Sequence, residues 1–130
     1  MSEELILEKV GIAERTLVFS LKVIRFHKKL AHDEVGRILG KQLLRSGTSI
    51  GANVHEAQGA QTKADFIAKM SIAQKEALET AYWLRLIKEA QLVLPDDIID
   101  LFDETSQLLK ILSKILITSK RNSSQSIFHF

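Results

Sequence analysis

Apolar residues recur at spacings of three and four along most of the chain, which is the periodicity of an amphipathic helix. Four such stretches occur, over about residues 3–31, 33–58, 62–92 and 95–119. The pattern therefore predicts four long helices joined by short links. The apolar stripe of the first stretch consists of Ile6, Val10, Ala13, Leu17, Leu21 and Ile24.

The predicted helices begin and end at residues that suit those positions. Asp33 is a candidate N-cap for the second helix, and Gly59 is a natural stop for it. Thr62 precedes the third helix and forms a pattern like a capping box with Asp65. Pro95, the only proline, stands at the first position of the fourth helix, where an N–H group is not needed.

Short links force consecutive helices to run antiparallel. The sequence therefore predicts an all-α fold, an antiparallel up-down-up-down four-helix bundle that occupies residues 1–119. The segment 120–130 lacks helical periodicity, and we expect it to be a flexible C-terminal tail. A chain of 130 residues forms one domain of this kind.

Composition limits the function classes that fit. The chain has no cysteine, which excludes disulfide scaffolds, thiolate zinc sites and thiol nucleophiles. It lacks an apolar run of about 18 residues, and its first residues are acidic where a secretory signal would be basic. These features predict a soluble, cytoplasmic protein. The net charge of +2 is too small to imply a nucleic-acid partner by itself.

The common templates for catalysis do not fit this chain. No glutamate precedes a histidine by three residues, which is the di-iron pattern of helical bundles. His55-Glu56 lacks the second histidine of a metalloprotease helix, because position 59 is glycine. The segment 36–42 resembles a phosphate loop but is one residue short and lies inside a predicted helix. We therefore predict no catalytic residue, no metal site and no cofactor, and a protein that is not an enzyme.

Four glycines gather on one side of the second predicted helix. At 100° per residue they fall within a sector of roughly 60° beside the apolar stripe. Each costs the helix about 1 kcal/mol relative to alanine, so a packing reason is expected. We interpret them as a site where a neighbouring backbone approaches closely. These residues are Gly36, Gly40, Gly47 and Gly51.

Polar residues follow the opposite flank of the same stripe. We expect them to form a buried seam with two carboxylates of the third helix, in which Glu76 or Glu79 pairs with Arg45. An alternative is that the two carboxylates act as an acid/base pair in a small enzyme. The predicted seam consists of Arg45, Ser49, Asn53, Glu56, Glu76 and Glu79.

The third helix carries a second stripe beside its core face, about 100° away. Its apolar members are Ile72, Trp83 and Leu86, and the two carboxylates lie between Ile72 and Trp83 on the same stripe. A bundle helix needs only one apolar face, and aromatic anchors are common in subunit interfaces. This stripe therefore predicts an interface of a homo-oligomer.

Charge is uneven along the chain. Between Lys22 and Arg45 there are seven basic and two acidic residues, whereas Asp96 to Glu104 contains five acids and no base. Such a distribution predicts a molecule with one positive and one negative end, although solvated helix faces would give the same pattern. The candidate contacts for nucleic-acid phosphates are Lys22, Arg25, Lys29, Arg37 and Lys41.

Two motifs resemble a known family. Residues 45–57 read RSGTSIGANVHEA and resemble the R-S-x-x-S-I-x-x-N-I-x-E-G signature of a bacterial four-helix bundle family, with Ala57 in place of the last glycine. Residues 72–84 read IAQKEALETAYWL and are similar to the I-A-x-K-E-A-x-E-T-x-Y-W-L form of one branch. The family includes proteins encoded in intervening sequences of large-subunit ribosomal RNA genes and accessory variability proteins of diversity-generating retroelements.

The resemblance implies a ring-like homo-oligomer, commonly a pentamer, without catalytic activity. Retroelement members are thought to bind nucleic acid and to assist a reverse transcriptase. For this chain the sequence thus favours an oligomeric scaffold or adaptor that binds nucleic acid electrostatically and presents it to a partner enzyme. The alternative is a protein-only interaction module without affinity for nucleic acid.

Overall fold

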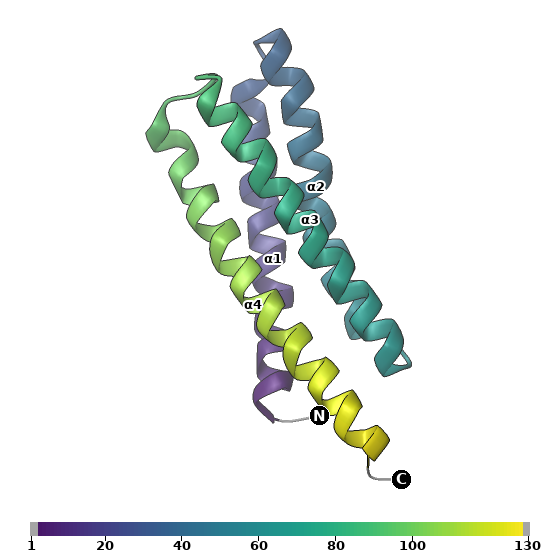
Figure 1. Ribbon diagram of the computed structural model, residues 1–130. Helices are drawn as coiled ribbons and strands as arrows, with labels where there is room; N and C mark the ends of the chain where they lie inside the picture. Colours follow the sequence, from purple (N-terminus) through teal and green to yellow (C-terminus); the bar gives the residue numbers. More distant parts are fainter. Residues whose placement is uncertain (1–2, 129–130) are drawn as a thin grey trace.

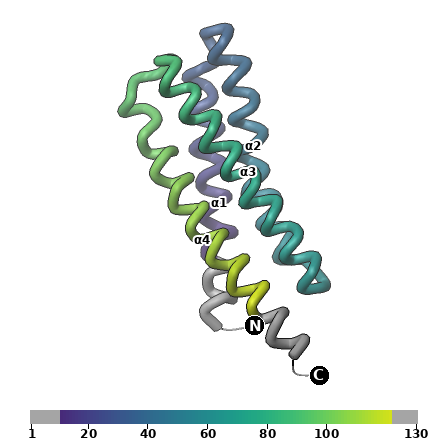
Figure 2. Tube along the Cα trace, viewed as in Figure 1, coloured from purple at the N-terminus to yellow at the C-terminus, as the bar shows by residue number. Residues whose placement is uncertain are grey.

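A computed structural model describes the backbone of residues 3–128 and the side chains of residues 11–121. Within this part, the chain forms four helices that run alternately up and down (Figure 1). The trace in Figure 2 shows the short turns between them. The predicted all-α, antiparallel four-helix bundle is confirmed. The helices are α1 (Glu3–Leu30), α2 (Glu34–Gln58), α3 (Lys63–Glu89) and α4 (Pro95–Phe128).

The helix caps are those that the sequence predicts. The Asp33 carboxylate accepts a hydrogen bond from the backbone N–H of Gly36 at 2.7 Å, which caps α2. The Thr62 hydroxyl accepts one from the N–H of Asp65 at 3.0 Å and caps α3. After α3, Gln91 adopts a left-handed conformation with φ of 57°, a geometry that commonly ends a helix.

The fourth helix is longer than its apolar periodicity predicts. It continues to Phe128, beyond the predicted end near residue 119. The segment 120–128 is therefore helical, and its flexibility stays a prediction. Residues 129 and 130 of the predicted tail lie outside the described part of the chain.

The stripe predicted for the first helix is only partly correct. Its member Ala13 is buried, whereas the side chains of Ile6 and Val10 lie outside the described residues. Leu17, Leu21 and Ile24 are 46%, 43% and 40% exposed. The reason is that α1 carries two apolar stripes, and periodicity alone does not determine which one faces the core. The core stripe of α1 consists of Ile12, Thr16, Phe19, Val23, Phe26 and Leu30.

The glycines of α2 lie against α1, as their interpretation as a close-packing site requires. A Cβ atom added at Gly47 would lie 3.0 Å from a methyl group of Val23. One added at Gly51 would lie 3.2 Å from the backbone oxygen of Thr16. The two helices thus approach more closely than any side chain larger than hydrogen would allow without a shift.

Each helix packs against two neighbours, so the bundle has four seams. The α2–α3 and α1–α2 contacts are the most extensive, and the α1–α4 contact is the least. All four helices contribute to one hydrophobic core, in which Phe19, Leu43, Leu84 and Leu112 are fully buried.

Two glycine substitutions separate helix propensity from packing. Gly11→Ala places its methyl group where no atom lies within 4 Å, so it should stabilise the protein by up to about 1 kcal/mol. Gly47→Ala gains the same propensity but crowds Val23, which is β-branched and fully buried. We expect it to be less stable than Gly11→Ala by about 1–3 kcal/mol in urea denaturation. Equal stabilisation by both substitutions would contradict the close-packing interpretation.

Candidate functional site

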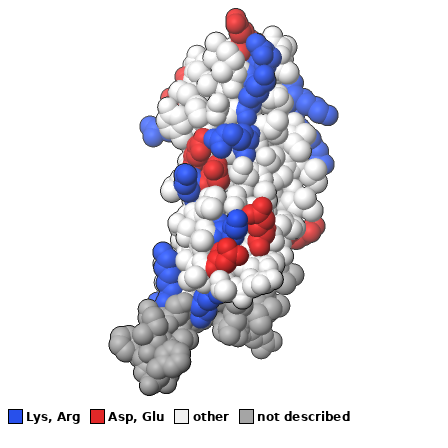
Figure 3. Space-filling view, turned by 90° about the vertical axis from the view of Figure 1, so that its right-hand side faces the viewer, with Lys and Arg blue, Asp and Glu red and all other residues white. Residues whose placement is uncertain are grey.

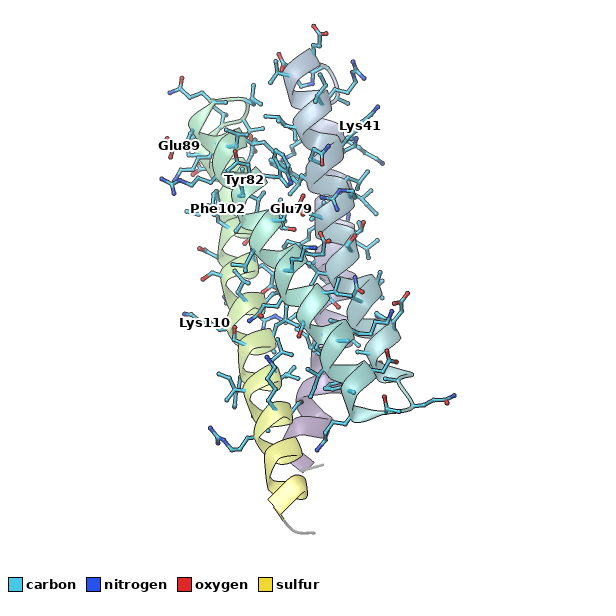
Figure 4. All side chains as sticks on the ribbon, turned by 45° about the vertical axis from the view of Figure 1, so that its right-hand side comes forward. Lys41, Glu79, Tyr82, Glu89, Phe102 and Lys110 are labelled. Atoms are coloured by element: carbon cyan, nitrogen blue, oxygen red, sulfur yellow. The ribbon has the colours of Figure 1, made fainter. Side chains whose placement is uncertain are left out.

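Arg45 on α2 reaches across the surface to two carboxylates of α3. One guanidinium nitrogen, Nη1, lies 3.5 Å from Glu76 Oε2, and Nη2 contacts Glu79. The indole N–H of Trp83 donates a second hydrogen bond to Glu79, at 3.1 Å. This group is therefore an ion-paired cluster within one chain that joins α2 to α3. The side chain of Glu79 lies between the two helices in Figure 4.

The predicted seam is more exposed than expected. The Arg45 side chain is 50% exposed, Glu79 30% and Glu76 12%. The prediction of a buried pair is thus wrong for the arginine, because its position on α2 lies at the rim of the α2–α3 contact. Pairing at this exposure is screened by water and contributes little to stability.

The remaining seam residues form hydrogen bonds or ion pairs outside the arginine cluster. The Ser49 hydroxyl donates to the backbone oxygen of Arg45 at 2.6 Å, and the Asn53 amide donates to that of Ser49 at 2.8 Å. Glu56 is 60% exposed and pairs with Lys69 of α3 at 3.1 Å, and this hydrogen bond raises the pKa of Lys69. A continuous buried seam is therefore not present.

A buried hydroxyl pair lies beneath the arginine cluster. Thr80 Oγ1 donates to Ser46 Oγ at 3.0 Å, and both residues are fully buried between α2 and α3. The sequence analysis missed this pair. The signal was present, because each polar residue occupies an apolar position in the helical pattern of its segment.

Two of the predicted nucleic-acid contacts bind carboxylates of the same chain. Lys22 lies 3.8 Å from Asp100, and Lys29 lies 3.3 Å from Asp97. Arg15 and Glu104 form a third pair on the same seam, at 2.6 Å, and this hydrogen bond raises the pKa of Arg15. The predicted separation into a positive and a negative end is wrong, because antiparallel α1 and α4 bring the two segments side by side.

The other predicted cations are exposed, two of them in the first turns of α2 and Arg25 on the α4 side of α1. Arg25, Arg37 and Lys41 are exposed, and no residue of the described range 11–121 forms an ion pair with them. Figure 4 shows Lys41 projecting away from α2. The face seen in Figure 3 carries basic groups toward this end and alternating basic and acidic groups farther down.

The predicted interface residues of α3 differ in exposure. Ile72 is 39% exposed, whereas Trp83 and Leu86 are half-buried and Trp83 packs against the core. Part of this stripe is thus covered by the chain's own α2–α3 contact. Tyr82, which the sequence analysis did not single out, is 58% exposed and meets Trp83 edge-on at 5.1 Å between ring centroids.

The described residues contain no cluster of histidine, aspartate and glutamate side chains that could hold a metal ion. His55, whose ring Nε2 lies 3.2 Å from the backbone oxygen of Ala13, joins α2 to α1. Among the described helices, none is both long and apolar enough to cross a membrane.

These features define a four-helix bundle whose polar clusters join neighbouring helices. The chain belongs to the 23S rRNA-intervening sequence protein family, whose sequence profile matches residues 8–114. This range contains α2, α3, most of α1 and the first part of α4, so the resemblance noted in α2 and α3 extends across the bundle.

A solved structure shows the same fold. It is the crystal structure of a protein of unknown function from the S23 ribosomal protein family of Bacteroides thetaiotaomicron. The two chains are 36% identical and superpose with a TM-score of 0.79, over 84% of this chain and 97% of the other. No curated protein matches the chain.

The two layers of the α2–α3 contact should differ in their effect on stability. Arg45→Ala removes a half-exposed partner and should cost about 0–1 kcal/mol. Thr80→Val keeps the side-chain shape but removes the donor to Ser46, and should cost about 1–3 kcal/mol. Urea denaturation measures both losses. Adding Ser46→Ala and the double variant Ser46→Ala/Thr80→Val completes a cycle that gives the Ser46–Thr80 coupling. A larger loss for Arg45→Ala than for Thr80→Val would contradict this order.

Proposed function

We propose that the protein is a non-catalytic homo-oligomeric scaffold that binds the phosphates of nucleic acid at the α1–α2 end of the bundle. The observation that carries the proposal is the pair Arg37 and Lys41. They lie one turn apart on α2, both are exposed, and within residues 11–121 no carboxylate pairs with either. Cations that are not neutralised internally are the ones available to an external phosphate.

Neighbouring cations extend this site onto α1. Gly40 packs against His27, so α1 and α2 are in contact at this level. Lys28 follows His27 in the sequence and Lys41 follows Gly40, and both lysines are exposed. Arg25 is also exposed, but it lines a groove with Lys29, Asp97 and Asp100 on the α4 side of α1 and is not part of this site. Three or four cations alone bind a phosphate chain weakly at physiological salt.

Oligomer formation would multiply this weak binding. In a ring, each copy presents the same cations, and the second contact with one strand becomes intramolecular. The exposed apolar groups of α3, which are Ile72, Tyr82 and the accessible edge of Trp83, supply a surface for such an assembly. A partner enzyme, such as a reverse transcriptase, would receive the bound strand.

Binding should depend on salt and on local charge. We expect a fluorescently labelled RNA to bind at 50 mM salt. RNA is chosen because the family is named after intervening sequences of 23S rRNA. With about three neutralised phosphates on a single strand, affinity should fall roughly tenfold or more between 50 and 200 mM. Arg37→Glu/Lys41→Glu should abolish binding, as measured by fluorescence anisotropy.

A matched control tests whether the position of the charge matters. Lys63→Glu/Lys120→Glu makes the same change in net charge at two exposed positions near the opposite end of the bundle, away from Ile72, Tyr82 and Trp83. It should retain binding if the α1–α2 end is the site. Equal loss in both variants, or no binding to labelled RNA or DNA at 50 mM salt, would contradict the proposal.

Assembly is tested separately by light scattering. We expect a mass several times the 14.6 kDa of one chain. Ile72→Asp places a charge on the exposed α3 surface without entering the core, so it should lower the mass while helicity is unchanged. Trp83→Ala should also lower it. A monomer at micromolar concentration in the unmodified protein would rule out the scaffold.

A second candidate function, a protein-only interaction module, is favoured by a different observation. Leu17, Leu21 and Ile24 form an exposed aliphatic stripe along α1, at spacings of four and three. Exposed contiguous apolar surface of this kind marks a protein contact rather than a phosphate contact. Assembly without any affinity for RNA or DNA would support this candidate over the first.

A further inference from the structure

The outward face of α4 has an ordered charge pattern. Eight exposed residues fall within a sector of roughly 80° on the helix, so they form one stripe along its length. The first half of the stripe is acidic, the second half is basic, and each half contains one exposed isoleucine. The α4 stripe consists of Asp96, Ile99, Asp103, Ser106, Lys110, Lys114, Ile117 and Arg121.

The helix dipole accounts for only part of this pattern. Acidic groups are favourable in the first turn of a helix and basic groups in the last turn, and the effect fades within those turns. Asp96 lies in the first turn. Asp103, Lys110 and Lys114 lie in interior turns of a helix that ends at Phe128. Moreover, the chain contains no acidic residue after Glu104. A different reason is therefore needed for the two halves.

In two antiparallel copies of the α4 stripe, the acidic half of each faces the basic half of the other. We propose that the α4 stripe docks onto the same stripe of a second copy, with the two α4 helices antiparallel about a two-fold axis at the level of Leu108. Ile99 then lies opposite Ile117 of the partner subunit. Asp103 lies opposite Lys114 of the partner subunit, and Asp96 lies opposite Arg121 of the partner subunit. Each contact occurs twice, as in every isologous interface.

The orientation follows from charge. A parallel pair would place acids opposite acids and bases opposite bases, and like charges in contact are strongly unfavourable. The antiparallel pair opposes unlike charges along the whole stripe. The two isoleucines are 18 residues apart, which is five turns, so both lie on the same side of the helix at equal distances from the axis.

A hollow beside the basic half provides space for the partner's isoleucine. It lies between α3 and α4, with Leu78, Leu109 and Ile117 among its lining residues and with Lys110 and Arg121 at its edge. Ile117 is 58% exposed and Ile99 is 57% exposed. In the proposed pair, Ile99 of the partner subunit packs on the apolar lining and its aspartates meet the basic edge. This surface includes Leu78 of α3 but not Ile72 or Trp83, which the proposed scaffold uses, and it does not depend on nucleic-acid binding.

Thiol cross-linking tests the antiparallel pairing directly, because the natural chain has no cysteine. Ile99→Cys and Ile117→Cys are made separately at exposed positions. In the proposed pair, identical cysteines lie about 27 Å apart, so neither variant alone should form a covalent dimer. An equimolar mixture should form one on oxidation or with a short bifunctional thiol reagent. Lys41→Cys, at an exposed position of α2, which packs against α1 and α3, is the control; mixed with either variant it should not react.

A charge exchange provides an independent test. The charge variants are made in the Ile72→Asp background, which removes the α3 assembly. Asp103→Lys and Lys114→Asp each place like charges in contact, so each should raise the dimer dissociation constant about tenfold or more in analytical ultracentrifugation. A mixture of the two variants restores both unlike pairs and should associate as a heterodimer. The doubly exchanged chain should dimerise again.

The outcomes of these tests are distinct from those of the scaffold tests. Cross-linking of Ile99→Cys with itself, which indicates a parallel pair, would overturn the proposal. So would the absence of cross-linking in the mixture, or single charge reversals without effect. Ile72→Asp should leave the mixed cross-link intact, so loss of the α3 assembly and loss of the α4 pairing are separate results.

Discussion

The close approach of α1 and α2 is the constraint on which the arrangement of the bundle depends. The motif Arg45-Ser46-Gly47 shows how α2 meets two neighbours at once. Gly47 lets the α1 side chain Val23 approach one flank of the helix. Ser46 faces Thr80 in the interior of the α2–α3 contact, and Arg45 covers the rim of that contact. Three consecutive residues thus serve three different layers, and the two that the signature specifies, Arg45 and Ser46, are those that face α3.

Local features of the fold could be predicted from the sequence because they depend on neighbouring residues. The caps at Asp33 and Thr62 and the start at Pro95 involve residues within one turn. The choice of core stripe in α1 depends on the other helices. Leu17 and Phe19 are both apolar, yet only Phe19 is buried. The continuation of α4 beyond residue 119 also gives no apolar signal, because a polar helix has no periodic stripe.

The residues that pair in the candidate site could be predicted from the sequence, but their exposure to solvent could not. Spacing placed Arg45 on the flank of α2 that meets Glu79 of α3, because helical periodicity determines side-chain direction. Whether such a pair is buried depends on how far it lies from the seam, which spacing does not report. The cations were harder to assign, since Lys29 and its partner Asp97 are 68 residues apart. Only the antiparallel packing of the first and last helices shows that this lysine is already neutralised.

The ionic α1–α4 seam also bears on the order in which the bundle forms. It joins residues separated by up to 92 positions, whereas consecutive helices meet through short turns. Closing a loop of that length costs more chain entropy than forming a helical hairpin, and non-local contacts of this kind slow folding. Within the described part of the chain it is also the least extensive of the four seams. The hairpins would form first and the two ends of the chain would join last, so transient opening of the native bundle is expected to begin where α1 meets α4.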